Sequence, residues 1–273
     1  MITKEGKVAL GVPSTDVEDV KSLACFDQIT GFEDEVGMIH SIAHHFKHFE
    51  IQEGSVGLEY TFLTHSMMGM LTHPHGKPEK VVAKDCTPVL STLRIAKEDG
   101  EIERIRAAGS VAVAGMAAAV KALKPGLTES QVAAEAEYAM RQAGADEFWR
   151  TYVCSGPRTN IAHGLPTQRR IQKGDLVMMD IHPIVNGYSA DICRTVCVGK
   201  PTTEQQAAYN LYLKAQQATI AQVKTGVDMT YLDETLHGII RDGGHGDHLF
   251  GPTMHGVGIE FEEAPLPPGH AFF

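Results

Sequence analysis

A two-residue turn signal between two apolar runs constrains this chain more than any other feature. The first run, Asp175 to Ile181, reads DLVMMDI, and the second extends from Tyr188 to Val198, with Asn186-Gly187 between them. Asn-Gly is a strong hairpin signal because both residues tolerate the positive φ that a tight turn requires. We therefore expect two antiparallel strands joined at Asn186-Gly187.

Each strand of this predicted hairpin carries an aspartate. Asp180 comes at the end of the first apolar run, and Asp191 lies on the returning strand. A carboxylate beside a buried strand is costly unless a positive group pairs with it, and the hairpin holds no Lys or Arg except Arg194. A divalent cation is the natural partner, because carboxylates suit Mg, Mn, Zn or Fe. Two solvated carboxylates at the end of a hairpin would explain the pair equally well.

A histidine bracketed by glycines strengthens the metal hypothesis. His255 lies in the segment GPTMHGVG, residues 251–258, and it precedes an expected strand at Val257–Phe261. Glycines there permit close approach of the backbone and unusual torsion angles. A lone histidine in such a place is usually structural, but two aspartates and a histidine on successive core strands are less readily accidental.

The rest of the chain divides near residue 97. Residues 1–96 read as alternating short strands and helices, including a strand at Val8–Val12 and helices at Asp16–Leu23 and Glu35–Phe49. Beyond residue 97 the patterns predict the following segments: helices at Lys97–Leu123, Thr128–Ala143, Thr202–Lys224 and Tyr231–Arg241, a strand at Arg150–Cys154 and a loop at Ser155–Pro166. Capping boxes open the second and third of these helices, Thr128–Gln131 and Thr202–Gln205.

Histidines also gather in the first part of the chain, and we interpret them as polar surface groups. Four lie in the predicted helix at Glu35–Phe49, and three lie in a stretch that reads as a loop. No carboxylate or histidine partner can be placed beside them from the sequence. They are His40, His44, His45, His48, His65, His73 and His75.

Composition excludes several classes of protein. The formal net charge of −10 argues against a nucleic-acid binder, which usually has a basic face. The five cysteines show neither a disulfide framework nor a CxxC zinc spacing. The start of the sequence has no apolar region of a signal peptide, and no run approaches the roughly 18 apolar residues of a membrane span. We therefore expect a cytoplasmic protein with no membrane or nucleic-acid partner.

Four motifs together resemble one known family. They are SGPRTNIAHG at 155–164, KGDLVMMD at 173–180, GYSADICRT at 187–195 and HGVGIE at 255–260. Their order and spacing, across about residues 93–265, are similar to those of the pita-bread metallopeptidases (family M24), the group of Xaa-Pro aminopeptidase, prolidase and creatinase. Each motif alone is unspecific, whereas the combination is highly specific.

The resemblance implies roles for particular residues. Asp180, Asp191 and His255 match metal ligands, with Asp191 bridging two divalent ions (Mn, Co, Zn or Fe) that share an activated water. His163 matches a residue that binds substrate or assists proton transfer. Glu262 stands where the family usually has a second histidine that contacts the substrate carbonyl, and a glutamate donates a hydrogen bond only when protonated. We assign Glu262, with His163, to the catalytic group.

The resemblance also implies a fold and its extent. We expect an α+β chain with the pita-bread (creatinase/aminopeptidase) fold, made of a partial α/β creatinase/prolidase-like N-terminal domain at 1–96 and a catalytic domain at 97–273. The family's last two ligands are glutamates on later strands, which lie beyond Phe273 in the matching order. We therefore expect a catalytic domain without its final strands, and a chain that alone binds metal weakly, hydrolyses little and tends to aggregate.

For the intact protein the expected function is that of an Xaa-Pro aminopeptidase or dipeptidase, acting on a peptide or small amide as a homodimer. One alternative is a creatinase-like hydrolase of a small amide or amidine, since Ile181-His182-Pro183 differs from the commoner glycine-containing strand end. Another is a non-catalytic binding module of the same fold. The presence of Asp180, Asp191 and His255 argues against that module.

Overall fold

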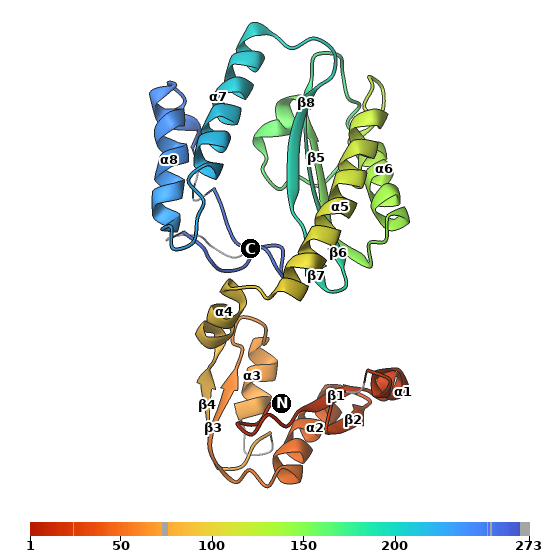
Figure 1. Cartoon of the computed structure of the whole chain (residues 1–273). Coiled ribbons are helices and arrows are strands. Elements are labelled where there is room, and N and C mark those ends of the chain that lie inside the picture. Colours follow the sequence, from red (N-terminus) through yellow and green to blue (C-terminus); the bar gives the residue numbers. More distant parts are fainter. Residues whose placement is uncertain (24, 73–75, 250, 252, 268–273) are drawn as a thin grey trace. The chain divides into compact units, whose positions relative to one another are not determined.

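The computed structural model describes residues 1–23, 25–72, 76–249, 251 and 253–267. The chain forms two compact units, Met1–Ser91 and Thr92–Phe273, shown in Figure 1. The division falls within helix α4 (Thr87–Ile95). The two units are described separately below.

The N-terminal unit holds two small parallel sheets and short helices. Strand β1 pairs with β2, and β3 pairs with β4. A parallel pair needs a crossover connection, which here is helical, so the predicted alternation of strands and helices is confirmed. The elements are β1 (Ala9–Pro13), β2 (Gln28–Phe32), β3 (Glu53–Leu58), β4 (Lys80–Asp85), α1 (Val17–Lys21), α2 (Glu35–His48) and α3 (His65–Thr72).

The histidines of this unit differ in their surroundings. His45 is buried, and its Nε2 lies 2.7 Å from Thr30 Oγ1, so its interpretation as a surface group is wrong. His40, His44 and His48 are exposed on α2, as expected. His65 begins α3, so the interpretation of its surroundings as a loop is wrong. His73 and His75 lie outside the described residues.

The larger unit is built on a four-stranded antiparallel sheet, with β6 in its middle. Strand β5 lies on one side of β6, and β7 and β8 follow one another on the other. The predicted hairpin is confirmed: Asn186 and Gly187 have φ of 49° and 77° and join β6 to β7. The bounds are β5 (Glu147–Ser155), β6 (Leu176–Val185), β7 (Tyr188–Ser189) and β8 (Ile192–Cys197).

Two features of this hairpin differ from the expectation. The first strand does not end at Ile181 but continues for four more residues, to Val185. The returning strand is interrupted at Ala190 and Asp191, which separate β7 from β8. Asp180 therefore lies inside a strand, and Asp191 lies at a break between two strands.

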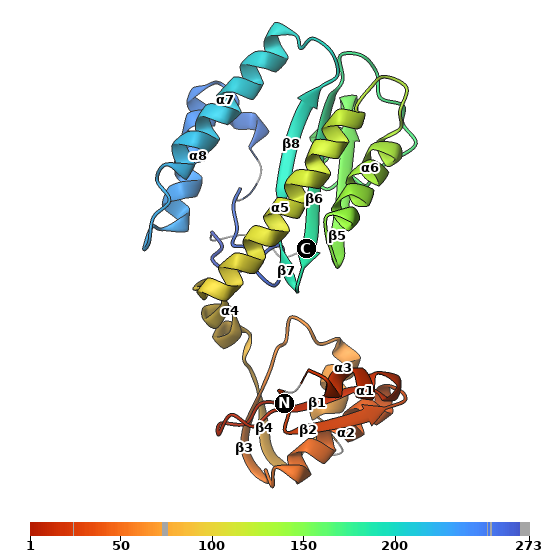
Figure 2. The ribbon, with the colours of Figure 1, turned by 45° about the vertical axis from the view of Figure 1, so that its right-hand side comes forward.

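Helices α5 (Asp99–Ala122) and α6 (Glu129–Gln142) cover one face of the sheet, as Figures 1 and 2 show. The capping box at the start of α6 is confirmed, because Gln131 N donates to Thr128 Oγ1 and Thr128 N donates to Gln131 Oε1. By length and composition α5 could cross a membrane. One side of it, including Ala108, Ala112 and Ala119, is buried in the core, as in a globular protein.

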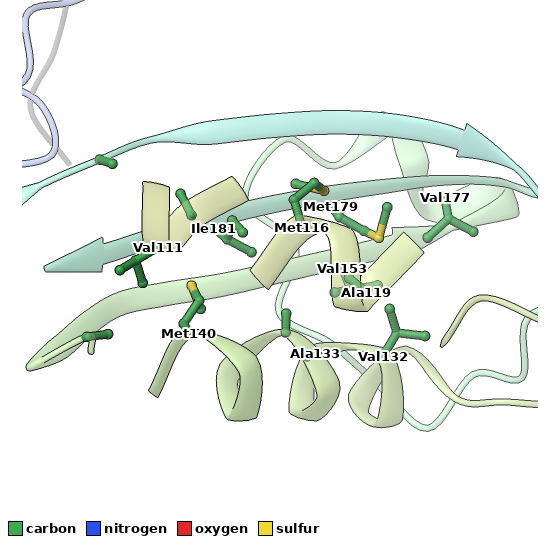
Figure 3. Close-up of a cluster of buried hydrophobic side chains, with 14 of the residues drawn as sticks. Val111, Met116, Ala119, Val132, Ala133, Met140, Val153, Val177, Met179 and Ile181 are labelled. Carbon is green, nitrogen blue, oxygen red and sulfur yellow. The ribbon is translucent and has the colours of Figure 1, made fainter. Parts of the chain in front are cut away.

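A cluster of apolar side chains fills much of the core between these two helices and the sheet. Side chains from α5 and α6 meet those of β5 and β6 (Figure 3). Met140 is fully buried, and it fills the space beside Gly115, where an added Cβ would lie 2.4 Å from Met140 Cγ. The core is therefore closely packed at the crossing of α5 and α6.

Replacing Met140 by alanine is expected to lower the free energy of unfolding by about 2–5 kcal/mol, because a fully buried side chain leaves a cavity. Denaturant unfolding at constant m-value measures this change. Tyr138→Ala, on the exposed side of the same helix, is the control and is expected to change it far less. Equal losses in the two variants would contradict the packing described here.

Helices α7 (Thr203–Ile220) and α8 (Met229–Asp242) pack against each other beyond strand β8, as both views show (Figures 1 and 2). The predicted capping box at Thr202 is confirmed, since Gln205 N donates to Thr202 Oγ1 and Thr202 N donates to Gln205 Oε1. The order helix, helix, hairpin, helix, helix is thus as expected. The described cysteines are free of disulfides, also as expected.

The strand expected at Val257–Phe261 is wrong. The segment turns back on itself: Gly256 N donates to Glu263 O at 2.9 Å, and Glu263 N donates to Gly256 O at 3.0 Å. Gly258 N donates to Glu260 O within the reversal. Local hydrogen bonds therefore replace the extended conformation that the apolar pattern suggested.

Candidate metal centre

Three side chains that could hold a metal ion meet on one face of strand β6 and at the break before β8. Asp180 and His182 are two residues apart on β6, so they point to the same face of the sheet. The register pairs Ile181 with Ile192, which brings Asp191 opposite His182. One potential ligand atom from each of these three side chains lies within 4.8 Å of the others. The sheet itself thus builds the cluster.

A fourth and a fifth side chain come from the C-terminal segment. His255 Nε2 lies 3.4 Å from Asp191 Oδ2 and 3.8 Å from Glu262 Oε1. On the other side of Asp191, its Oδ1 lies 3.5 Å from His182 Nε2. The structure therefore brings together four residues that the sequence suggested, Asp180, Asp191, His255 and Glu262, and it adds His182.

Contacts with the rest of the unit fix the segment that carries His255. Ser189 N donates to Gly258 O at 2.7 Å, and Lys97 forms an ion pair of 2.7 Å with the buried Glu263. Upstream, Asp233 of α8 accepts hydrogen bonds from the backbone and hydroxyl of Thr253. These contacts hold His255 and Glu262 against the sheet.

Backbone carbonyls orient both imidazole rings. His182 Nδ1 lies 2.9 Å from Arg150 O, and His255 Nδ1 lies 2.9 Å from Gly256 O. Because a carbonyl oxygen only accepts hydrogen bonds, each Nδ1 carries the proton. Each Nε2 is then directed at the carboxylates, the arrangement usual for histidines that bind metals.

The two aspartates have opposite electrostatic environments. Burial raises the pKa of Asp180 to about 6, and the charge of Asp191 adds to that rise. Burial also acts to raise the pKa of Asp191, but the imidazoles of His182 and His255, 3.5 and 3.4 Å away, outweigh it and hold that pKa below its ordinary value. Burial acts to lower the pKa of both histidines, yet the carboxylates keep it raised. The cluster therefore favours added positive charge.

The donor set fits a divalent cation. Asp180 Oδ1 is buried and has no hydrogen-bond partner among the described residues, and such an atom is costly unless a cation or donor satisfies it. His255 Nε2 and Asp191 Oδ2, 3.4 Å apart, have the spacing of neighbouring tetrahedral ligands, about 3.3–3.4 Å for bonds of about 2.0–2.1 Å. Carboxylates with imidazoles suit Mn, Fe, Co and Zn.

Aromatic rings line the cluster. His182 makes edge contacts with Tyr152 and Phe261, at ring-centre distances of 5.7 and 5.2 Å. Trp149 stacks on Phe261. His163 is exposed, and its ring centre lies 5.4 Å from that of Tyr152. Tyr152 thus contacts both His163 and His182. No sequence motif pointed to this group of aromatic rings beside the cluster.

The loop that carries His163 is tied to helix α6 by a buried carboxylate. Glu129 Oε1 accepts from Ser155 N and Oγ at 2.8 and 2.7 Å. Its Oε2 accepts from Thr167 N and Oγ1 at 3.0 and 2.6 Å and from Arg158 Nε at 3.1 Å. Five donors thus fix the two ends of the loop, and the loop holds His163 beside the cluster.

Comparisons with known proteins agree with this architecture. Residues 103–271 match the profile of metallopeptidase family M24. The Xaa-Pro dipeptidase of Pyrococcus furiosus is 37% identical over 183 residues, which are 67% of this chain and 53% of that protein. The chain thus spans about half the length of this curated relative.

Solved structures give the same answer for the fold. The prolidase from Pyrococcus furiosus superimposes with a TM-score of 0.83 and 30% identity, over 96% of this chain and 74% of that one. The Xaa-Pro dipeptidase from Bacillus anthracis gives 0.82 and 28%, over 93% and 70%. The α+β pita-bread fold expected from the motifs is confirmed, and the chain belongs to metallopeptidase family M24.

Proposed function

We propose that the protein is a metal-dependent hydrolase that cleaves Xaa-Pro dipeptides. The cluster of Asp180, Asp191 and His255, with its buried and unsatisfied carboxylate oxygen, carries this proposal. The substrate class follows the names of similar proteins, which include Xaa-Pro dipeptidases, prolidases and an X-Pro aminopeptidase. The sequence relative with 37% identity is named Xaa-Pro dipeptidase, which favours a dipeptidase.

Asp180, Asp191 and His255 would hold two divalent ions. Divalent ions in such a site lower the pKa of water toward neutrality and polarise the scissile carbonyl. Glu262, beside His255, accepts a proton at its carboxylate and passes it to the leaving amine. His163, which contacts Tyr152, binds the substrate at the edge of the cluster. We further propose that the ions are Mn, Co, Zn or Fe, and that the protein is a cytoplasmic homodimer.

One observation favours a second candidate, a metal-free hydrolase of a small amide or amidine. The histidines His182 and His255, whose pKa values the carboxylates raise, neutralise Asp180 and Asp191 as ion pairs. A charged imidazole is also able to act as a general acid. This candidate requires no ion, so it differs from the first in its response to chelators.

Chelation tests the two candidates on the protein in its native length. Removal of metal with a chelator and desalting is expected to reduce the hydrolysis of an Xaa-Pro dipeptide by at least about 100-fold, because water activation is lost. Adding back one of the four ions is expected to restore it. The matched control substrate is the Xaa-Ala dipeptide, which should be cleaved poorly. Undiminished hydrolysis of a small amide or amidine in excess chelator would support the second candidate instead.

A further inference from the structure

We propose that His182 is itself a ligand of the ion held between Asp180 and Asp191, and that its nitrogen makes the site prefer zinc to manganese. This inference deepens the proposed function and rests on it for the presence of an ion. It adds a ligand on the sheet to the three that the family resemblance implied.

The interatomic distances support coordination rather than hydrogen bonding. His182 Nε2 lies 3.6 Å from Asp180 Oδ1 and 3.5 Å from Asp191 Oδ1. A charge-assisted N–H···O bond would be about 2.7–2.9 Å long. Two ligands of one tetrahedral ion lie about 3.3–3.4 Å apart. Both separations are near this second value, and one of them ends on the buried, unsatisfied oxygen of Asp180.

The ring of His182 is also held in the orientation that a ligand requires. Its side chain is 3% exposed, and Nδ1 is engaged by Arg150 O. The rings of Tyr152 and Phe261 make T-shaped contacts with the ring of His182. A ring fixed on three sides loses little conformational entropy when it binds an ion, which favours affinity.

Nitrogen ligation changes which ions the site prefers. Carboxylates and water suit Mg and Mn, whereas imidazole suits Zn, Cu, Fe and Ni. With His182 and His255 the cluster offers two imidazole nitrogens beside its carboxylates. The ratio of zinc affinity to manganese affinity should therefore depend on His182.

His182→Asn separates the ligand role from the structural one. The asparagine amide can still donate to Arg150 O, as Nδ1 does, but it presents no nitrogen at the position of Nε2. We expect zinc affinity to fall by about 10–100-fold and manganese affinity to fall much less. Competition titrations with a chromophoric chelator measure both. His40→Asn, at an exposed histidine of the N-terminal unit, is the control and should change neither affinity.

A zinc-to-manganese ratio that is the same in wild type and His182→Asn would overturn the inference. A second measurement needs no variant. In the wild-type protein, zinc should shift the ¹⁵N resonances of two Nε2 atoms of the cluster, those of His182 and His255. A shift of only one would also overturn it. If the ratio depends on His182 but no Xaa-Pro dipeptide is cleaved, the proposed function fails and the ligand assignment stands. If an Xaa-Pro dipeptide is cleaved but the zinc-to-manganese ratio is the same in wild type and variant, the ligand assignment fails and the proposed function stands.

Discussion

Replacing Asp191 by asparagine is expected to remove the bound ions and to lower kcat/KM by about 1,000-fold or more, since activation of water depends on them. The two oxygens of Asp191 face different histidines, His182 Nε2 at 3.5 Å and His255 Nε2 at 3.4 Å. Asparagine has nearly the same shape, but its neutral amide offers one oxygen and no charge. Metal analysis after dialysis and steady-state kinetics on the native-length protein measure the two effects.

Asp242→Asn is the matched control, because Asp242 is exposed at the end of α8. It should keep the metal content and the kinetics of the wild type. Ion content and turnover close to wild type in Asp191→Asn would show that Asp191 is not a ligand. Loss of turnover with full ion content would place Asp191 in catalysis but not in metal binding.

The second large effect concerns stability. Glu129→Gln is expected to lower the free energy of unfolding at pH 7 by about 3–5 kcal/mol, the usual cost of breaking a buried charged pair. Glu129 is completely buried and pairs with Arg158. The glutamine amide would direct N–H groups at donors of Ser155 or Thr167. Denaturant unfolding measures the loss, and Glu135→Gln, exposed on the same helix, is the control.

The loss of stability in Glu129→Gln should depend on pH. Burial acts to raise the pKa of Glu129, but hydrogen bonds from Thr167 and Ser155 outweigh it and keep that pKa below its ordinary 4.5. The charged carboxylate therefore stabilises the fold above that pH, and the contribution is lost as the pH falls through the lowered pKa. The difference between wild type and Glu129→Gln should shrink in strong acid. A difference below 1 kcal/mol at pH 7, or one that grows in acid, would contradict this account.

Most elements of the larger unit were predicted from the sequence, because their signals are local. The turn at Asn186-Gly187 and the caps at Thr128 and Thr202 depend on neighbours within a few residues, and all three are present in the structure. Asp180 and Asp191 were found because the turn fixes the pairing of their strands. That they act as metal ligands stays a prediction.

What the sequence did not predict depends on contacts between distant segments. The ion pair of Lys97 with Glu263 and the hydrogen bond from Ser189 N to Gly258 O join residues that no local pattern connects. His182 was missed as a candidate ligand for a different reason, because the expected strand ended one residue before it, at Ile181. Had it been extended, the two-residue spacing would have placed His182 beside Asp180.

The surroundings of Glu262 were also predicted only in part. Its position relative to His255 came from the motif, and the structure places its carboxylate 3.8 Å from His255 Nε2. Glu260, two residues earlier, instead pairs with Arg94 at 2.9 Å. A strand would place the two glutamates on one face. The turn separates their partners, so Glu262 alone of the two contacts the cluster.

Anomalous X-ray diffraction from crystals of the metal-loaded protein tests the central claim most directly. Data collected at the absorption edge of the added ion locate that ion independently of any assay. The account predicts anomalous peaks at the cluster, each within about 2.0–2.2 Å of its ligand atoms, which come from Asp180, Asp191 and His255; these are the usual bond lengths for a zinc site. No peak there at saturating metal, or a peak elsewhere with the cluster held by its own ion pairs, would contradict it.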